Sequence, residues 1–167
     1  AERGIISGRT ETVFAPLENV TRAEFVKMLA AASGVSGTSG EVPSFSDVEA
    51  SSWYAPYVAW AEENGIANGS GGKFRPSDQI TKQEMAVMIQ RYAQTAGVEI
   101  PQMETGSVFL DDATIAHYAR EAVYRLQKAG IVSGDINGKF YPLSSATRAQ
   151  AAKMLAVFLQ VTDRKST

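Results

Sequence analysis

The sequence predicts an all-α fold with internal pseudo-symmetry, in which one helical motif is written three times. The first observation is spacing: two sets of anchor residues recur at intervals of 60 and 66 residues, namely Phe14, Phe74 and Phe140, and Thr21, Thr81 and Thr147. The second is that each of these threonines opens a run with apolar residues at helical spacing. The third is length: 167 residues, 44% of them hydrophobic, are enough for several repeats to share one core.

The shared motif begins at Gly4, Gly65 and Gly130. In each copy a Gly-Ile pair leads through a loop with a second glycine to Phe-x-Pro, and then to Thr-basic-x-Glu or Gln. An upstream half-motif precedes only the second and third copies, where the matching pairs are Phe45 and Phe109, Asp47 and Asp111, and Trp53 and Tyr118. Because this half is not present before Gly4, we expect the chain to begin inside its first repeat, without that repeat's first helix.

The downstream half of each repeat predicts a capped helix. Thr21 can accept a hydrogen bond from the amide three residues on, and Glu24 stands at the reciprocal position of a capping box. The other copies carry the same pair, as Thr81 with Glu84 and Thr147 with Gln150. Apolar residues follow at helical spacing and predict the core: Phe25, Met28, Leu29, Met85, Met88, Ile89, Ala151, Met154, Leu155 and Phe158.

The upstream half predicts a shorter helix. In the second repeat, Asp47 or a nearby serine would cap it, and it would end at Gly65 in the left-handed conformation that suits glycine. Its counterpart spans residues 118–128 and ends before Gly130. The Phe-x-Pro segments are predicted to be short and extended, because the residue before proline disfavours the helical conformation.

These elements place the repeats at residues 1–37, 38–100 and 101–167, which together form one structural domain. The segments 33–43 and 95–107 are predicted to be linkers between repeats. Two small helices bury little surface alone, so packing of the repeats around a common axis is expected to supply the core.

Composition argues against several classes of function. A net charge of −2 gives no global positive field for nucleic acid, and no apolar run reaches the roughly 20 residues that span a bilayer. There is no cysteine, and the single histidine, His117, has no partner for a metal site or a catalytic triad. We therefore predict no enzyme, no cofactor, no metal and no membrane insertion. If the protein is secreted, its signal peptide lies upstream of Ala1.

The recurring motifs resemble those of the S-layer homology domain. They are Phe45-Ser46-Asp47 with Trp53, Gly65-Ile66, Phe74-Arg75-Pro76 and Thr21-Arg22-Ala23-Glu24. The resemblance covers nearly the whole chain and implies a pseudo-threefold, three-pronged spindle of helices. It also implies an extracellular module of a bacterial cell wall or S-layer. Such a module binds a secondary cell wall polysaccharide non-covalently in grooves between repeats, and the polymer often carries pyruvylated N-acetylmannosamine.

The resemblance associates the arginine of the Thr-Arg-Ala-Glu motif with the ligand, which implies Arg22 and Arg148 here. Both stand at the first helical position, where free amides and partial positive charge favour an anion such as a pyruvyl carboxylate. Pairing with a surface acid is the plainer alternative. Lys82 replaces arginine in the second repeat, and its ammonium lacks the planar fork that grips a carboxylate, so we expect a weaker site there.

Further residues are predicted to contact the sugar. Trp53 and Tyr118 would stack on it, or would instead pack within the fold. The glycine loops would approach it closely, or would simply turn the chain; their residues are Ser7, Gly8, Asn68, Gly69, Ser133 and Gly134. Asp47 and Asp111 are predicted to be helix caps more than ligand groups. The alternative function is a protein-interaction or self-assembly module, in which another chain supplies the missing first helix by domain swapping.

Overall fold

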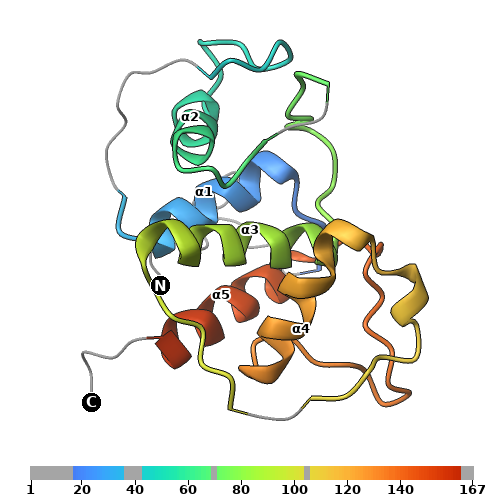
Figure 1. Cartoon of the computed structure of the whole chain (residues 1–167). Coiled ribbons are helices and arrows are strands. Elements are labelled where there is room, and N and C mark those ends of the chain that lie inside the picture. Colours follow the sequence, from blue (N-terminus) through green and yellow to red (C-terminus); the bar gives the residue numbers. More distant parts are fainter. Residues whose placement is uncertain (1–16, 36–42, 69–70, 104–105, 163–167) are drawn as a thin grey trace.

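The computed structural model describes residues 17–35, 43–68, 71–103 and 106–162 (Figure 1). Over these residues it holds helices and isolated β-bridges but no strand. The α-helices are α1 (Arg22–Ala32), α2 (Ala55–Glu63), α3 (Lys82–Ala96), α4 (Arg120–Lys128) and α5 (Arg148–Thr162). Two short 3₁₀ helices, η1 (Asp112–Thr114) and η2 (His117–Ala119), precede α4. The predicted all-α fold is confirmed, whereas the three-pronged outline stays a prediction.

The helices α1, α3 and α5 begin at the capping threonines that the sequence predicts. Thr21 Oγ1 accepts a hydrogen bond from the Glu24 amide at 3.1 Å, and Glu24 Oε1 accepts one from the Thr21 amide at 2.9 Å. The same reciprocal pair opens α3 and α5. After α2 and α4, Gly65 and Gly130 have φ of 71° and 80°, the predicted left-handed conformation.

Three backbone hydrogen bonds join the segments just before α1, α3 and α5 into a closed ring. The Val20 amide donates to the Ala146 carbonyl at 2.9 Å, and the Ile80 amide donates to the Val20 carbonyl at 2.9 Å. The Ala146 amide closes the ring by donating to the Ile80 carbonyl at 3.0 Å. All three residues are completely buried. Because each repeat donates to one neighbour and accepts from the other, the ring relates the repeats cyclically.

The first amides of the helices also bond across repeats. The Arg22 and Ala23 amides donate to the Asp78 and Pro76 carbonyls at 2.8 and 3.1 Å. The other helices repeat the pattern, from Lys82 and Gln83 to Ser144 and Pro142, and from Arg148 to Glu18. Since the third amide of α1 and of α3 donates to the capping threonine, the prediction of free anion-binding amides at these two helix starts is wrong.

Aspartates fold the Phe-x-Pro segments sharply. The Asp47 carboxylate accepts hydrogen bonds from the amides of Phe74 and Arg75, both at 2.8 Å. The third repeat has the equivalent bonds, to Asp111 from Phe140 and Tyr141. Arg75 and Tyr141 lie at φ of 62° and 61°, in the left-handed region. The predicted extended conformation is therefore wrong at Arg75 and Tyr141, while the first Phe-x-Pro segment lies outside the described residues. Helix capping by the two aspartates is also wrong: their carboxylates hold loop amides, and neither α2 nor η1 has a side-chain cap.

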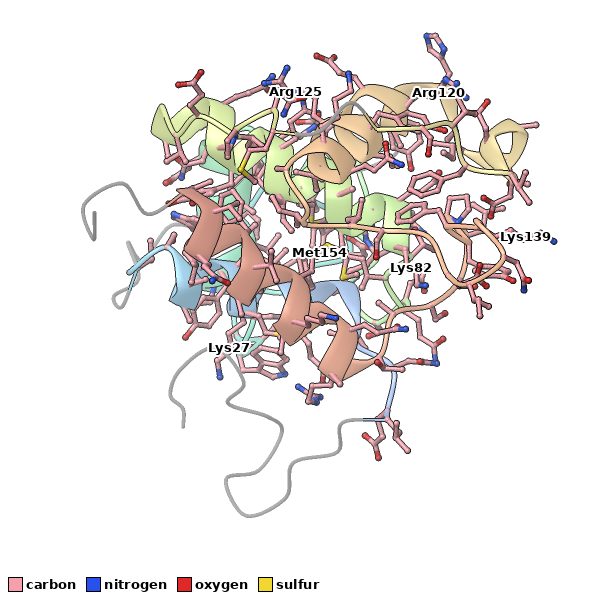
Figure 2. The ribbon with its side chains drawn as sticks, turned by 90° about the horizontal axis from the view of Figure 1, so that it is seen from below. Lys27, Lys82, Arg120, Arg125, Lys139 and Met154 are labelled. Atoms are coloured by element: carbon pink, nitrogen blue, oxygen red, sulfur yellow. The ribbon has the colours of Figure 1, made fainter. Side chains whose placement is uncertain are left out.

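The helices pair across the predicted repeat borders. α1 packs against α2 and α3 against α4, and α1 also contacts α5 (Figure 1). Each of the first two pairs joins the second helix of one repeat to the first helix of the next. Side chains fill the space between the helices (Figure 2), and every core residue predicted from helical spacing is buried.

Residues 98–103 are packed on the protein instead of forming a free linker. Ile100 is only 3% exposed. The Met103 amide donates to the Lys128 carbonyl at 3.1 Å, and the Gln102 side chain donates to the Arg125 carbonyl at 3.1 Å. The predicted linker 95–107 is therefore wrong over this stretch, because an apolar side chain and α4 carbonyls hold it in place.

Replacement of Asp47 by alanine removes the acceptor shared by two loop amides. We expect the free energy of unfolding to fall by about 1–3 kcal/mol, measured by urea titration at pH 7. Burial raises the pKa of Asp47, but the amides of Phe74 and Arg75 outweigh it and hold the pKa below its usual value. The stabilisation is therefore present above the unfolded pKa of about 3.9 and is lost as the pH falls below it.

The matched control is Glu49→Ala, which removes an exposed acid from the same segment. It is expected to change stability by no more than about 0.5 kcal/mol. Equal losses for Asp47→Ala and Glu49→Ala would contradict the role assigned to the two amide bonds.

Candidate functional site

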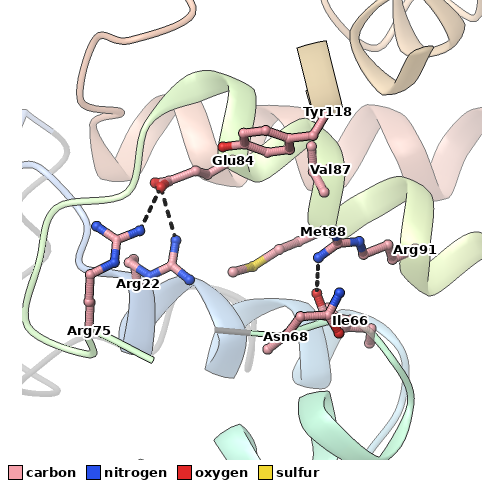
Figure 3. A pocket seen from close by; sticks show the side chains of 10 residues that line it. Arg22, Ile66, Asn68, Arg75, Glu84, Val87, Met88, Arg91 and Tyr118 are labelled. Carbon is pink, nitrogen blue, oxygen red and sulfur yellow. Dashed lines mark hydrogen bonds and ion pairs between the residues drawn. The ribbon is translucent and has the colours of Figure 1, made fainter. Parts of the chain in front are cut away.

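A groove of ≈ 410 Å³ opens where parts of all three predicted repeats meet (Figure 3). α1 supplies Arg22, and η2 supplies Tyr118. The segment between α2 and α3, together with α3 itself, supplies the rest. The complete lining is Arg22, Ile66, Ala67, Asn68, Arg75, Glu84, Val87, Met88, Arg91 and Tyr118. The α3 members are three or four residues apart and thus share one face of that helix.

Arg22 forms the wall of the groove and is only 6% exposed. Its Nε donates to the Phe74 carbonyl at 2.9 Å, and its guanidinium lies 4.9 Å from the centre of the Phe74 ring. Its Nη1 pairs with Glu84 Oε2 at 3.1 Å. Burial lowers the pKa of Arg22, against the opposing influence of Glu84. The charge of Arg22 is therefore already matched by a carboxylate of the next repeat.

Glu84 joins the cap of α3 to two arginines. Its Oε1 accepts from the Thr81 amide at 2.9 Å, and its Oε2 accepts from Arg22 and, at 3.0 Å, from Arg75. Burial raises the pKa of Glu84, but the Thr81 amide and the two arginines outweigh it and hold the pKa below its usual value. For Arg75, burial lowers the pKa, and the bonds to Glu84 and Asp78 outweigh it and raise the pKa. This end of the groove is a closely paired charge cluster.

The pairing follows a cyclic rule. The basic residue at the start of one helix meets the acid of the next repeat: Arg22 meets Glu84, and Arg148 Nη2 lies 3.5 Å from Glu24 Oε2. At the third junction the equivalent positions hold Lys82 and Gln150. Lys82 makes no ion pair within the described residues, and its Nζ lies 5.7 Å from the centre of the Tyr141 ring. The lysine that replaces arginine and the glutamine that replaces glutamate thus belong to one junction.

Arg148 is more deeply buried than Arg22, at 2% exposed, and it does not line the groove. Its Nη2 has no hydrogen-bond partner within the described part of the chain beyond the long contact to Glu24. The geometry makes Arg148 a link between repeats 3 and 1. Ligand binding by Arg148, and a weaker site at Lys82, stay predictions.

The opposite end of the groove brings together Asn68, a predicted ligand residue, and Arg91, which was not predicted. Arg91 Nη1 donates to the Ile66 carbonyl at 3.2 Å, and Asn68 lies beside it, with Met88 between this end and the charge cluster (Figure 3). Tyr118 is 58% exposed and lies beside Glu84 and Val87, at the end of the groove that holds the charge cluster (Figure 3). Neither Arg91 nor Arg75 was expected at the site. Arg75 could have been suspected as the variable position of Phe-x-Pro, whereas only a helical projection from Glu84 points to Arg91.

The other predicted residues lie elsewhere. Trp53 is 53% exposed, packs edge-on against Tyr54 at 5.2 Å between ring centres, and has Lys27 Nζ at 5.6 Å from its ring. Gly134 makes its close approach to the Phe109 ring. Ser133 is exposed and does not line the groove. Ser7, Gly8 and Gly69 lie outside the described residues.

The fold and this groove define a helical repeat module with a charged surface between its repeats. The chain belongs to the S-layer homology domain family, which matches residues 1–26, 44–86 and 109–152. This family is a cell-wall anchoring module, and membership places the chain outside the cell, at the cell wall. None of the described helices has the length and apolar character that crossing a membrane requires.

Related proteins carry the same module. An amylopullulanase of Thermoanaerobacterium thermosulfurigenes is 36% identical over 96% of this chain, and an exoglucanase, XynX, of Acetivibrio thermocellus is 34% identical over 96%. An S-layer protein of Bacillus thuringiensis subsp. finitimus is 28% identical over 93%. The chain spans only 8%, 15% and 18% of these three proteins.

Glu84→Gln keeps an oxygen for the Thr81 amide but removes the charge shared by Arg22 and Arg75. Because a buried arginine is left without its counter-charge, we expect a loss of about 3–5 kcal/mol in the free energy of unfolding at pH 7. The pKa of Glu84 is depressed in the fold, so its contribution is lost as the pH falls below the ordinary value of 4.5. The gap between wild type and variant is therefore expected to shrink in acid. Glu63→Gln, at an exposed position of α2, is the control.

Combining Glu84→Gln with Arg22→Lys reproduces the chemistry of Lys82 and Gln150 at the third junction. The double variant is expected to recover part of the loss, because the more flexible ammonium can reach water. Urea titration of the two single variants and the double variant measures this coupling. Strictly additive losses would contradict the paired role of the two positions.

Proposed function

We propose that this module anchors the protein that carries it to the bacterial cell wall by binding an anionic, pyruvylated secondary cell wall polysaccharide in grooves between its repeats. The observation that carries the proposal is the charge of the described groove. Three arginines, Arg22, Arg75 and Arg91, line it with one glutamate, Glu84, and Arg75 also pairs with Asp78, which leaves a local charge of +1 (3 − 2) in a chain whose net charge is −2. A local positive surface on an acidic protein favours an anionic ligand.

The shape and lining of the groove suit a sugar residue. Its volume of ≈ 410 Å³ lies within the range of about 300–1,000 Å³ typical of small-molecule sites. Val87 and Met88 offer an apolar floor, and the exposed ring of Tyr118 can cover the apolar face of a pyranose. A pyruvyl ketal would add a carboxylate, for which a guanidinium is the preferred partner.

The relatives support an anchoring role. An amylopullulanase, an exoglucanase and an S-layer protein differ in what their names say they do, yet each contains a segment similar to nearly all of this chain. A shared need to be held at the cell surface accounts for one module in such different proteins. We propose no catalytic role for the module itself.

The proposal extends to the other junctions and to the chain as a unit. Trp53 and Lys27 place an aromatic ring and a cation beside α1. Tyr118 likewise places an aromatic ring beside α3. Lys82 with Tyr141 offers a similar pair at the third junction. We propose that the repeats at 1–37, 38–100 and 101–167 act together as one binding domain.

Binding of the whole chain to purified wall polysaccharide tests the proposal. We expect co-sedimentation with polymer-bearing wall fragments, loss of binding after the pyruvyl groups are removed by mild acid, and no binding to bare peptidoglycan. Unchanged binding to bare peptidoglycan would overturn the proposal. Concentration-dependent mass in analytical ultracentrifugation, without polymer binding, would favour self-assembly instead.

Tyr118→Ala removes an exposed ring from the groove and leaves the core intact. We expect polymer affinity to fall about 2- to 12-fold, because aromatic contacts of this kind contribute about 0.5–1.5 kcal/mol. The measurement is isothermal titration with a polymer fragment. Ile136→Ala, at a residue 98% exposed and outside the groove, is the control and should bind as wild type does. Equal weakening in both variants would exclude Tyr118 from the site.

A further inference from the structure

The third repeat carries exposed apolar side chains where the second repeat carries serine. Counted from the phenylalanine and proline of each motif copy, Ser44, Ser46, Ser70 and Ser77 in the second repeat match Val108, Leu110, Ile136 and Leu143 in the third. These four apolar residues are between 60% and 98% exposed. Single exposed apolar residues are ordinary, but a set that replaces serine at four matched positions needs a physical reason.

The fold does not supply that reason. The Leu110 amide donates to the Gly138 carbonyl at 2.9 Å, and at the matched place the Ser46 amide donates to the Gly72 carbonyl, also at 2.9 Å. In both repeats the aspartate that follows holds two loop amides. Because the backbone bonds are the same with serine and with an apolar residue, the apolar side chains serve something outside the chain.

These side chains gather around one turn of the third repeat. A Cβ on Gly138 would lie 3.5 Å from Leu110 Cγ, so Leu110 lies against this turn. Ile136 belongs to the same turn. Leu143 lines a hollow of ≈ 380 Å³ together with Lys139, at the end of the turn. We call Leu110, Ile136 and Leu143 the apolar patch, and none of them lines the groove along α3.

The charges beside the patch are self-complementary. Asp135 and Lys139 stand at the two ends of the turn, are exposed, and carry opposite signs; Lys139 points outward from the protein (Figure 2). The Asp135 amide donates to the Lys139 carbonyl at 2.9 Å, and the Lys139 amide donates to Asp135 Oδ1 at 3.0 Å, which fixes their positions. In a two-fold contact each surface meets its own copy, so Asp135 of one copy can face Lys139 of the other.

The patch is too small for a tight complex. Three or four aliphatic side chains cover roughly a few hundred Å², whereas a standard interface buries about 800 Å² on each partner. Such a contact is useful only where the partner is held close by at a high local concentration. A module anchored on the cell wall is surrounded by other copies of itself, whereas a soluble partner would have no such advantage.

We propose that the apolar patch forms a two-fold contact between two copies of the chain when they are crowded on the cell wall. The choice of a second copy rests on the proposed function, because anchoring supplies the local concentration, but the contact itself needs no polymer. Its dissociation constant in solution is expected to be about 0.1–1 mM, as for a weak, transient interface.

Sedimentation equilibrium of the whole chain, from about 10 μM to about 1 mM, measures the contact. The test variant combines Leu110→Ser, Ile136→Ser and Leu143→Ser, which gives the third repeat the residues that the second repeat already carries. We expect wild type to dimerise and this triple variant to associate at least about 100-fold more weakly, because each buried aliphatic side chain contributes about tenfold or more. Thermal melting checks that the variants are folded. Leu17→Ser is the matched control, because Leu17 is exposed and occupies the position of Leu143 in the first repeat.

Disulfide trapping tests the two-fold geometry, since the chain has no cysteine of its own. A two-fold axis through the patch places the two copies of residue 136 side by side. Ile136→Cys is therefore expected to form a disulfide dimer under copper–phenanthroline oxidation faster than Leu17→Cys does. Adding Leu110→Ser and Leu143→Ser to the Ile136→Cys chain should slow trapping to the control rate.

A wild-type chain that stays monomeric at about 1 mM would overturn the inference. So would dimerisation of the triple variant with wild-type affinity, or equal trapping rates for Ile136→Cys and Leu17→Cys. The proposed function is tested separately, because the chain is monomeric at micromolar concentration and the triple variant should there bind the polymer as wild type does. Wild type that dimerises but binds no polymer would overturn the proposed function and leave the two-copy contact standing.

Discussion

The ring of hydrogen bonds through Val20, Ile80 and Ala146 is the constraint on which the rest of the structure depends. It fixes the starts of α1, α3 and α5 next to one another, so the basic residue two positions later lies against a neighbouring repeat, where Arg22 meets Glu84 and Arg148 meets Glu24. Buried backbone groups need partners, and here each repeat can satisfy its own only with the other two in place. The groove follows from this arrangement, because its walls come from segments that only the ring brings together.

The charged pairs at the junctions form between repeats that this ring has already placed side by side. A buried arginine is costly unless an acid and hydrogen bonds meet it, and Arg22 meets both in Glu84 and Phe74. Such a pair contributes more to the correct order of the repeats than to the free energy of unfolding. A repeat placed in the wrong order would set mismatched side chains opposite each other. The simultaneous change to Lys82 and Gln150 at one junction fits this interpretation, because both sides of the pair lose the features that matched them.

Local signals allowed much of the fold to be predicted. Capping threonines marked the helix starts, glycines marked the ends, and helical spacing identified buried residues such as Phe25 and Leu155. The misses involve partners distant in sequence. Asp47 looked like a helix cap because its true partners, the Phe74 and Arg75 amides, lie 27 and 28 residues away. At the site, motif resemblance pointed to Arg22, but its partner Glu84 and the position of Arg91 depend on the cyclic arrangement, which no local pattern encodes.

The pairing of α1 with α2 and of α3 with α4 has a consequence for how such a chain can be divided. A fragment cut at the sequence borders of the second repeat would contain α2 without α1 and α3 without α4, with an apolar face of each laid bare. The sequence repeat is therefore not the same segment as the helix pair that buries its own apolar surface. The two are offset from each other by one helix. A single repeat exchanged between relatives would therefore have to pack against both of its neighbouring repeats at once.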